Sequence, residues 1–198
     1  MADGSAMNRN ARQWGSILFF AAGGFLLIDV AFLWIRFFSD FRLSILWAAA
    51  PGIMAFAASV LGLLTLYSRI SLETPLIARC GAGFALAAIT ALCIAAFWII
   101  WVSIFSNGIS ESPPNGVLAL AGIFLVSMII AFICYAVAFL LSGSPQNIGY
   151  LLAVPVAAWS VMLVVGMIKG LEAGLSLDLY TNALIAAAFL SIGFILQK

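Results

Sequence analysis

The sequence predicts an all-α, polytopic integral membrane protein, folded as one bundle of six transmembrane helices. Of its 198 residues, 66% are hydrophobic and only 8% are charged, whereas roughly 25% are charged in typical soluble domains. A bilayer solvates this many apolar side chains on the outside of a helix bundle, and water does not. The apolar runs are continuous and do not alternate with polar residues, which indicates helices instead of the strands of a membrane barrel.

Six apolar runs are long enough to cross the hydrocarbon core, which takes about 20 helical residues. The breaks between them are short and polar or contain proline and glycine, so no second domain fits between two runs. We expect residues 1–16 to form a cytoplasmic N-terminal tail and residues 17–198 to form a single six-helix domain. The predicted spans are 17–38, 44–67, 81–105, 117–141, 148–168 and 179–196.

The basic residues predict the orientation of the bundle. In a six-helix arrangement, five of them fall on the side of the two termini and three on the opposite side. Because cytoplasmic loops carry the excess of lysine and arginine, we expect a multi-pass protein of the cell membrane with both termini in the cytoplasm. The five are Arg9, Arg12, Arg69, Arg79 and Lys198, and the three are Arg36, Arg42 and Lys169.

Small residues predict where the helices pack, because association in lipid depends on close backbone approach. The third run has four of them at four-residue spacing, and the second run has Gly62, so we expect the third helix to be central. Proline in a helix removes a backbone hydrogen bond and can bend it, so Pro51 and Pro155 predict bends in the second and fifth helices. The stripe in the third run consists of Gly83, Ala87, Ala91 and Ala95.

Several classes of chemistry have no residues to support them. The chain contains no histidine, which excludes bis-histidine haem ligation and Ser-His hydrolysis within it. The acids outside the runs stand singly, so none forms a Mg²⁺ cluster, and the three cysteines lack C-x-x-C spacing. We expect a protein that is not an enzyme and holds no metal or other cofactor. Its few basic residues are not clustered, so nucleic acid is not an expected partner.

Asp29 is the only acid inside any apolar run. A charged side chain at membrane depth costs at least about 2.5–3.5 kcal/mol, so it must be paired, solvated or used. Leu26, Leu33 and Arg36 share its helical face, and three polar residues of the fifth and sixth helices fall in the same half of the membrane. The resulting candidate patch comprises Asp29, Arg36, Lys169, Thr181 and Asn182. It is either a buried anchor between helices or a proton- or cation-binding carboxylate site.

Two segments resemble a known group of proteins. The segment G-L-L-T-L-Y-S-R at 62–69, and the region 149–166 with Pro155 and Trp159, are similar to uncharacterised small multi-span membrane proteins of archaea, especially haloarchaea. The likeness covers about half of the chain, and its loops lack the acid excess usual in such organisms. Because that group has no established activity, the resemblance implies no site residues.

Two functions follow from these observations. The first is a non-enzymatic accessory or structural subunit of a larger membrane complex, with the lipid bilayer and other membrane subunits or further copies of this chain as partners. The alternative is a small transporter or channel for an ion or small solute. In that case Asp29 is the coupling or selectivity residue, and the helices with Pro51 and Pro155 are the moving elements.

Overall fold

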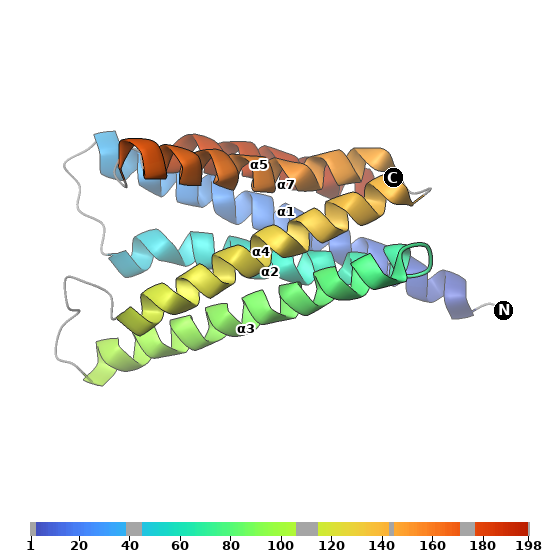
Figure 1. Cartoon of the computed structure of the whole chain (residues 1–198), viewed down its shortest axis with the longest axis horizontal. Helices are drawn as coiled ribbons and strands as arrows, with labels where there is room; N and C mark the ends of the chain where they lie inside the picture. Colours follow the sequence, from blue (N-terminus) through green and yellow to red (C-terminus); the bar gives the residue numbers. More distant parts are fainter. Residues whose placement is uncertain (1–2, 39–44, 106–114, 143–144, 171–176, 198) are drawn as a thin grey trace.

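The computed structural model describes residues 3–38, 45–105, 115–142, 145–170 and 177–197. Each helix in these ranges contains a stretch long and apolar enough to cross a membrane. The six helices are α1 (Asp3–Phe38), α2 (Ile45–Ile70), α3 (Pro75–Phe105), α4 (Asn115–Leu141), α5 (Gln146–Lys169) and α7 (Asp178–Gln197) (Figure 1). The predicted fold class, an all-α multi-pass membrane protein, is confirmed.

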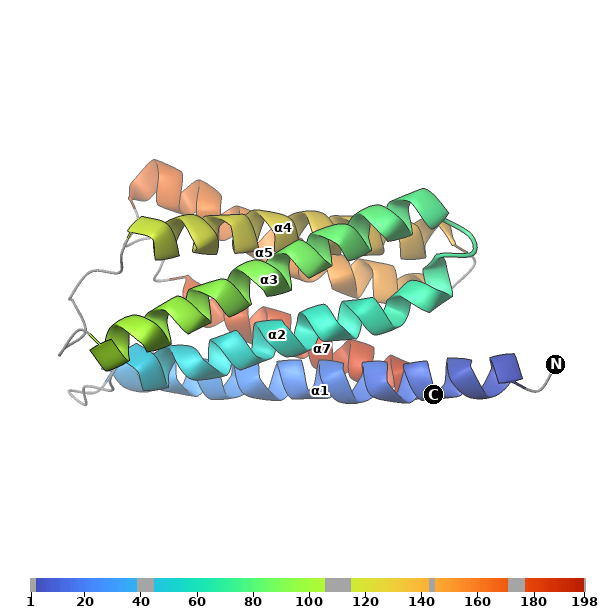
Figure 2. The ribbon, with the colours of Figure 1, turned by 90° about the horizontal axis from the view of Figure 1, so that it is seen from below.

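The helices form a ring in chain order. Each one from α1 to α5 packs against the next helix along the chain, and α7 closes the ring against α1. Figure 2 shows α2 lying between α1 and α3, and α2 also contacts α4 across the middle. Both termini lie at one end of the bundle (Figure 1). We call this end the terminal end and the opposite one the distal end.

The first helix begins earlier than predicted. Instead of a separate tail at residues 1–16, α1 is helical from Asp3, and its N-terminal half packs on α7. Arg12 Nε donates a hydrogen bond to the Leu196 carbonyl at 2.7 Å, and Ser16 Oγ donates to the Gly193 carbonyl at 2.9 Å. Apolar composition marks where a helix enters lipid and not where it starts, because polar residues also sustain helical backbone.

The third helix also begins before its predicted start, at Pro75 instead of Gly81. Proline is well suited to the first helical position, where its missing N–H would have no helical partner. The Ala78 N–H donates to the Thr74 carbonyl at 2.9 Å and closes the first turn. A four-residue turn at 71–74 therefore separates α2 from α3.

The prediction that the third helix is central was wrong. It packs mainly on α4, with a smaller contact to α2, and Gly83 and Ala87 are exposed whereas Ala91 and Ala95 are buried. Four residues turn a helix by about 400°, so each step of the stripe moves about 40° around the axis. The buried face of α3 follows mixed three- and four-residue steps instead, through Ala78, Gly81, Ala85 and Ala88.

Glycines bring helices close at several seams. A Cβ at Gly62 of α2 would lie 3.1 Å from the Phe19 ring of α1, and a Cβ at Gly81 of α3 would lie 2.9 Å from the Tyr135 ring of α4. Either side chain would force the facing ring to shift. The Gly62–Phe19 and Gly81–Tyr135 contacts are thus points of close approach in the α1–α2 and α3–α4 seams.

Three buried rings fill the middle of the bundle. Phe132 of α4 stacks on Phe189 of α7 with ring centroids 5.8 Å apart, and Phe189 lies 5.7 Å from Phe19 of α1. All three side chains are fully buried. We call Phe19, Phe132 and Phe189 the aromatic floor. They fill the space between the helices on the terminal side of a cavity in the distal half.

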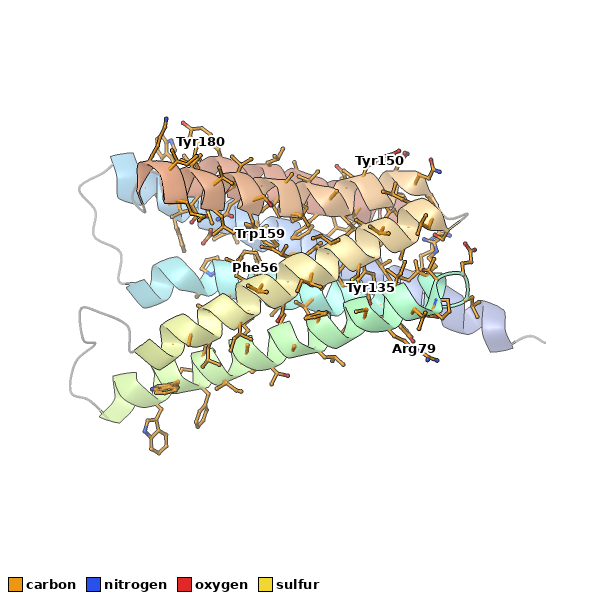
Figure 3. The ribbon with its side chains drawn as sticks, in the orientation of Figure 1. Phe56, Arg79, Tyr135, Tyr150, Trp159 and Tyr180 are labelled. Atoms are coloured by element: carbon orange, nitrogen blue, oxygen red, sulfur yellow. The ribbon has the colours of Figure 1, made fainter. Side chains whose placement is uncertain are left out.

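Exposed aromatic side chains mark the two ends of the bundle. Trp14 is exposed toward the terminal end, and Trp34, Trp98 and Trp101 are exposed toward the distal end. Tyr150 and Tyr180 also lie at opposite ends (Figure 3). Amphipathic rings at two levels are typical of the two membrane interfaces. The side chain of Trp47 lies outside the described residues.

Candidate functional site

A cavity of about 330 Å³ lies in the distal half of the bundle, inside the ring. Every helix contributes at least one residue to its wall, which the closed ring of six helices makes possible. The lining residues are Asp29 of α1, Gly52, Ile53 and Phe56 of α2, Leu92 of α3, Phe124 and Leu125 of α4, Trp159 and Met162 of α5, and Asp178 and Asn182 of α7.

Two carboxylates in this cavity lie near one amide. Asn182 Nδ2 donates a hydrogen bond to Asp29 Oδ2 at 2.9 Å, and Asn182 stands four residues after Asp178, on the same face of α7. Asp29 is 7% exposed. The amide thus joins a buried carboxylate of α1 to the first turn of α7, where the second carboxylate stands.

The backbone of α2 approaches the same carboxylate closely. A Cβ at position 52 would lie only 3.2 Å from Asp29 Oδ1. Gly52 directly follows Pro51, which has no N–H and disturbs the hydrogen bonding of its turn. A side chain at position 52 would crowd the carboxylate, so glycine suits this contact.

The start of α7 holds Asp178 in place. Thr181 Oγ1 donates to the carbonyls of Leu177 and Asp178, both at 3.1 Å. Asp178 is the first residue of α7, where the positive end of the helix dipole favours a negative charge. Thr181 therefore stabilises the first turn of α7 and does not bond Asp29 in the described hydrogen bonds.

Aromatic rings form the opposite wall. The Phe56 centroid lies 5.7 Å from that of Phe124 and 5.7 Å from that of Trp159, and Figure 3 shows Phe56 and Trp159 between α2 and α5. Trp159 in turn lies 5.8 Å from Phe132 of the aromatic floor. The cavity thus has a carboxylate side toward the distal end and an aromatic side toward the middle of the bundle.

No protein-family model, curated protein or solved structure matches the chain. The interpretation of the cavity therefore depends on its own geometry. The resemblance to archaeal multi-span proteins stays a prediction.

The predicted polar patch is brought together only in part. Asp29 and Asn182 are in direct contact, and Thr181 adjoins them in sequence but bonds its own helix. Lys169 is exposed at the C-terminal end of α5 and does not line the cavity. The side chain of Arg36 lies outside the described residues, although its backbone belongs to α1.

Sequence reasoning missed Asp178 and the aromatic wall. Asp178 borders the last apolar run, so it was grouped with loop acids, yet it stands four residues before Asn182 and four-residue spacing places both on one helical face. Trp159 is 4% exposed, and it also lines the cavity. The two predicted bend sites border the same space, because Pro51 precedes Gly52 and Pro155 lies one turn before Trp159.

Proposed function

We propose that the protein is a small membrane transporter that binds a cation in the distal cavity. The observation that carries this proposal is the Asp29–Asn182–Asp178 cluster in a cavity lined by all six helices. Buried carboxylates are costly and two neighbouring ones repel each other. A bound cation offsets both penalties, and among the described lining residues no lysine or arginine does so.

The rest of the bundle argues against a purely anchoring role for the acids. Where this chain builds close helix seams, it uses a glycine against a ring, as at Gly62–Phe19 and Gly81–Tyr135. An anchor of that kind leaves no open space. The carboxylates instead border a cavity, and the side chains that line a cavity lack the dispersion contacts of close packing.

The ring also supports a route for movement. Because each helix supplies part of the wall, a small displacement of any helix changes the shape of the cavity. The aromatic floor closes the cavity toward the terminal end, so alternating access requires these rings to separate. Pro51 and Pro155 lie in the two helices that carry Phe56 and Trp159, and proline weakens a helix at the turn where movement would occur.

We propose cytoplasmic termini, so that the cavity faces the opposite side of the membrane. The excess of basic residues at the terminal end supports this orientation. The accessory-subunit role stays a prediction, because no residue in the described part of the chain identifies a partner surface. We expect no enzymatic activity.

Reconstituted flux tests the proposal. Proteoliposomes with the full chain are exposed to gradients of H⁺, Na⁺, K⁺ or small organic ammonium ions, and the current is recorded on a solid-supported membrane. Asp29→Asn and Asp178→Asn should each abolish the current carried by the natural sequence. Glu73→Gln is the matched control, since Glu73 is an exposed acid in the turn at the terminal end. Equal currents in all three variants, or no current for any cation with the unmodified chain, would refute the proposal.

A further inference from the structure

The lining of the cavity indicates which class of cation it takes. We infer that the distal cavity binds an organic monocation, with its ammonium head between Asp29 and Asp178 and its apolar body against Phe56, Phe124 and Trp159. This inference rests on the proposed function and adds the substrate class to it.

The lining supplies few side-chain oxygens for a dehydrated divalent cation. Ca²⁺ takes 6–8 oxygen ligands and Mg²⁺ requires near-octahedral coordination, whereas the lining has three side chains that carry oxygen, Asp29, Asp178 and Asn182. The Asn182 amide nitrogen points at Asp29, and a donor there repels a metal ion. Among the described residues, no group of three or more His, Cys, Asp or Glu could hold a metal.

The size of the cavity suits a small molecule. Its volume of about 330 Å³ lies at the lower end of the range of about 300–1,000 Å³ that small-molecule pockets occupy. A bare ion at the carboxylates would leave most of this space facing Ile53, Leu92 and Leu125. An apolar body fills it and removes those side chains from water.

The aromatic wall suits an apolar, preferably aromatic, body on the ligand. Aromatic rings pair in offset or edge-to-face geometry and gain binding free energy beyond the burial of their area. Trp159 is 4% exposed and touches Phe56 and Phe132, so its ring is held in position. Met162 adds a polarisable thioether to the same wall.

The charges of the site favour a cationic ligand. Asp178 occupies the N-terminus of α7, where the helix dipole contributes about half a positive charge. Asn182 is neutral and satisfies one oxygen of Asp29 by a hydrogen bond. These groups offset only part of the charge of two carboxylates, so the site stays negative, which suits an ammonium placed between them.

Binding to the purified full chain in detergent tests this inference. The probe is benzyltrimethylammonium, compared with choline, the uncharged carbon isostere of choline, and NaCl. By isothermal titration, benzyltrimethylammonium should bind more tightly than choline because its ring reaches the aromatic wall, and the uncharged isostere and Na⁺ should not bind. Asp29→Asn should weaken binding at least about tenfold, as expected when a charged partner is removed.

Variants of Trp159 separate recognition from folding. Trp159→Leu should weaken benzyltrimethylammonium about 2- to 12-fold, the range expected when one aromatic ring pair is lost, whereas Trp159→Phe should retain most of the affinity. Trp14→Leu is the matched control, since Trp14 is exposed at the terminal end, and it should bind as the unmodified chain does. Circular dichroism of each variant verifies its helix content.

Each outcome has a defined meaning. Unchanged affinity in Trp159→Leu, or equal loss in Trp14→Leu, overturns the inference. If Na⁺ or H⁺ moves in an Asp29-dependent manner while no organic ammonium binds, the substrate class is wrong and the proposed function stands. If no cation binds or moves in a manner that depends on either carboxylate, both fail.

Discussion

Two buried polar side chains in opposite halves of the bundle are accommodated in opposite ways. In the distal half, Asp29 is buried, accepts a hydrogen bond from Asn182, and borders a cavity. In the terminal half, the fully buried Tyr135 hydroxyl has no hydrogen-bond partner among the described residues. Its ring is packed so closely that Gly81 has no room for a side chain. Close packing has been favoured over hydrogen bonding around Tyr135, and the reverse holds around Asp29.

This difference indicates which half is built for stability and which for binding. An unsatisfied buried hydroxyl costs about 1–3 kcal/mol, and the contacts that surround Tyr135 must offset that cost. A cavity forfeits dispersion contacts instead, and the hydrogen-bonded acids keep it polar. Substitutions in the terminal half should therefore change the free energy of unfolding, whereas substitutions around Asp29 should change binding.

The largest stability effect is expected in the aromatic floor. Phe189→Ala should lower the free energy of unfolding by about 3–5 kcal/mol, because it leaves a cavity between Phe19 and Phe132. Unfolding in mixed micelles with increasing denaturing detergent measures the change. Phe194→Ala is the control on the same helix, since Phe194 is 60% exposed, and its effect should be much smaller. Equal losses for both variants would contradict the role of the floor.

A smaller effect is expected at the α3–α4 seam. Gly81→Leu should destabilise the bundle by about 1–3 kcal/mol, because the added side chain forces the Tyr135 ring and the helix apart. Gly83, two residues along, lies on the opposite face of α3, and a Cβ there meets no atom within 4 Å, so Gly83→Leu should leave stability nearly unchanged. The same unfolding assay compares the two. A greater loss for Gly83→Leu would restore the four-residue stripe as the packing face of α3.

The smallest effect is expected from the unpaired hydroxyl itself. Tyr135→Phe removes a buried donor that has no partner and keeps the ring, so the free energy of unfolding should stay the same or rise by about 1 kcal/mol. Thr181→Val provides the contrast, because the single O–H of Thr181 is shared between the Leu177 and Asp178 carbonyls and its loss should destabilise the start of α7. A clear destabilisation by Tyr135→Phe would show that the hydroxyl has a bonding partner.

The sequence predicted the helices well and the seams only partly. Apolar runs of about 20 residues identify spans directly, since the bilayer sets their length. The face that a helix buries depends on its neighbours. The stripe from Gly83 to Ala95 therefore did not predict the buried face of α3. The contact between Asp29 and Asn182 joins residues 153 positions apart, and no local pattern encodes that α7 lies beside α1. The face shared by Asp178 and Asn182 was readable from their spacing, but the cavity it lines required the whole ring.

The closed ring has a consequence for the assembly of the site in the membrane. Five of its six seams join helices that follow one another in the chain, so these can form in sequence order as each hairpin is inserted, with little entropy lost in closing loops. The α1–α7 seam is the exception, since its bonds from Ser16 to Gly193 and from Asn182 to Asp29 span most of the chain. During synthesis Asp29 therefore lacks the hydrogen bond from Asn182 until α7 is inserted. Binding competence thus reports that insertion is finished, and a chain stopped before α7 leaves a carboxylate without the amide of Asn182.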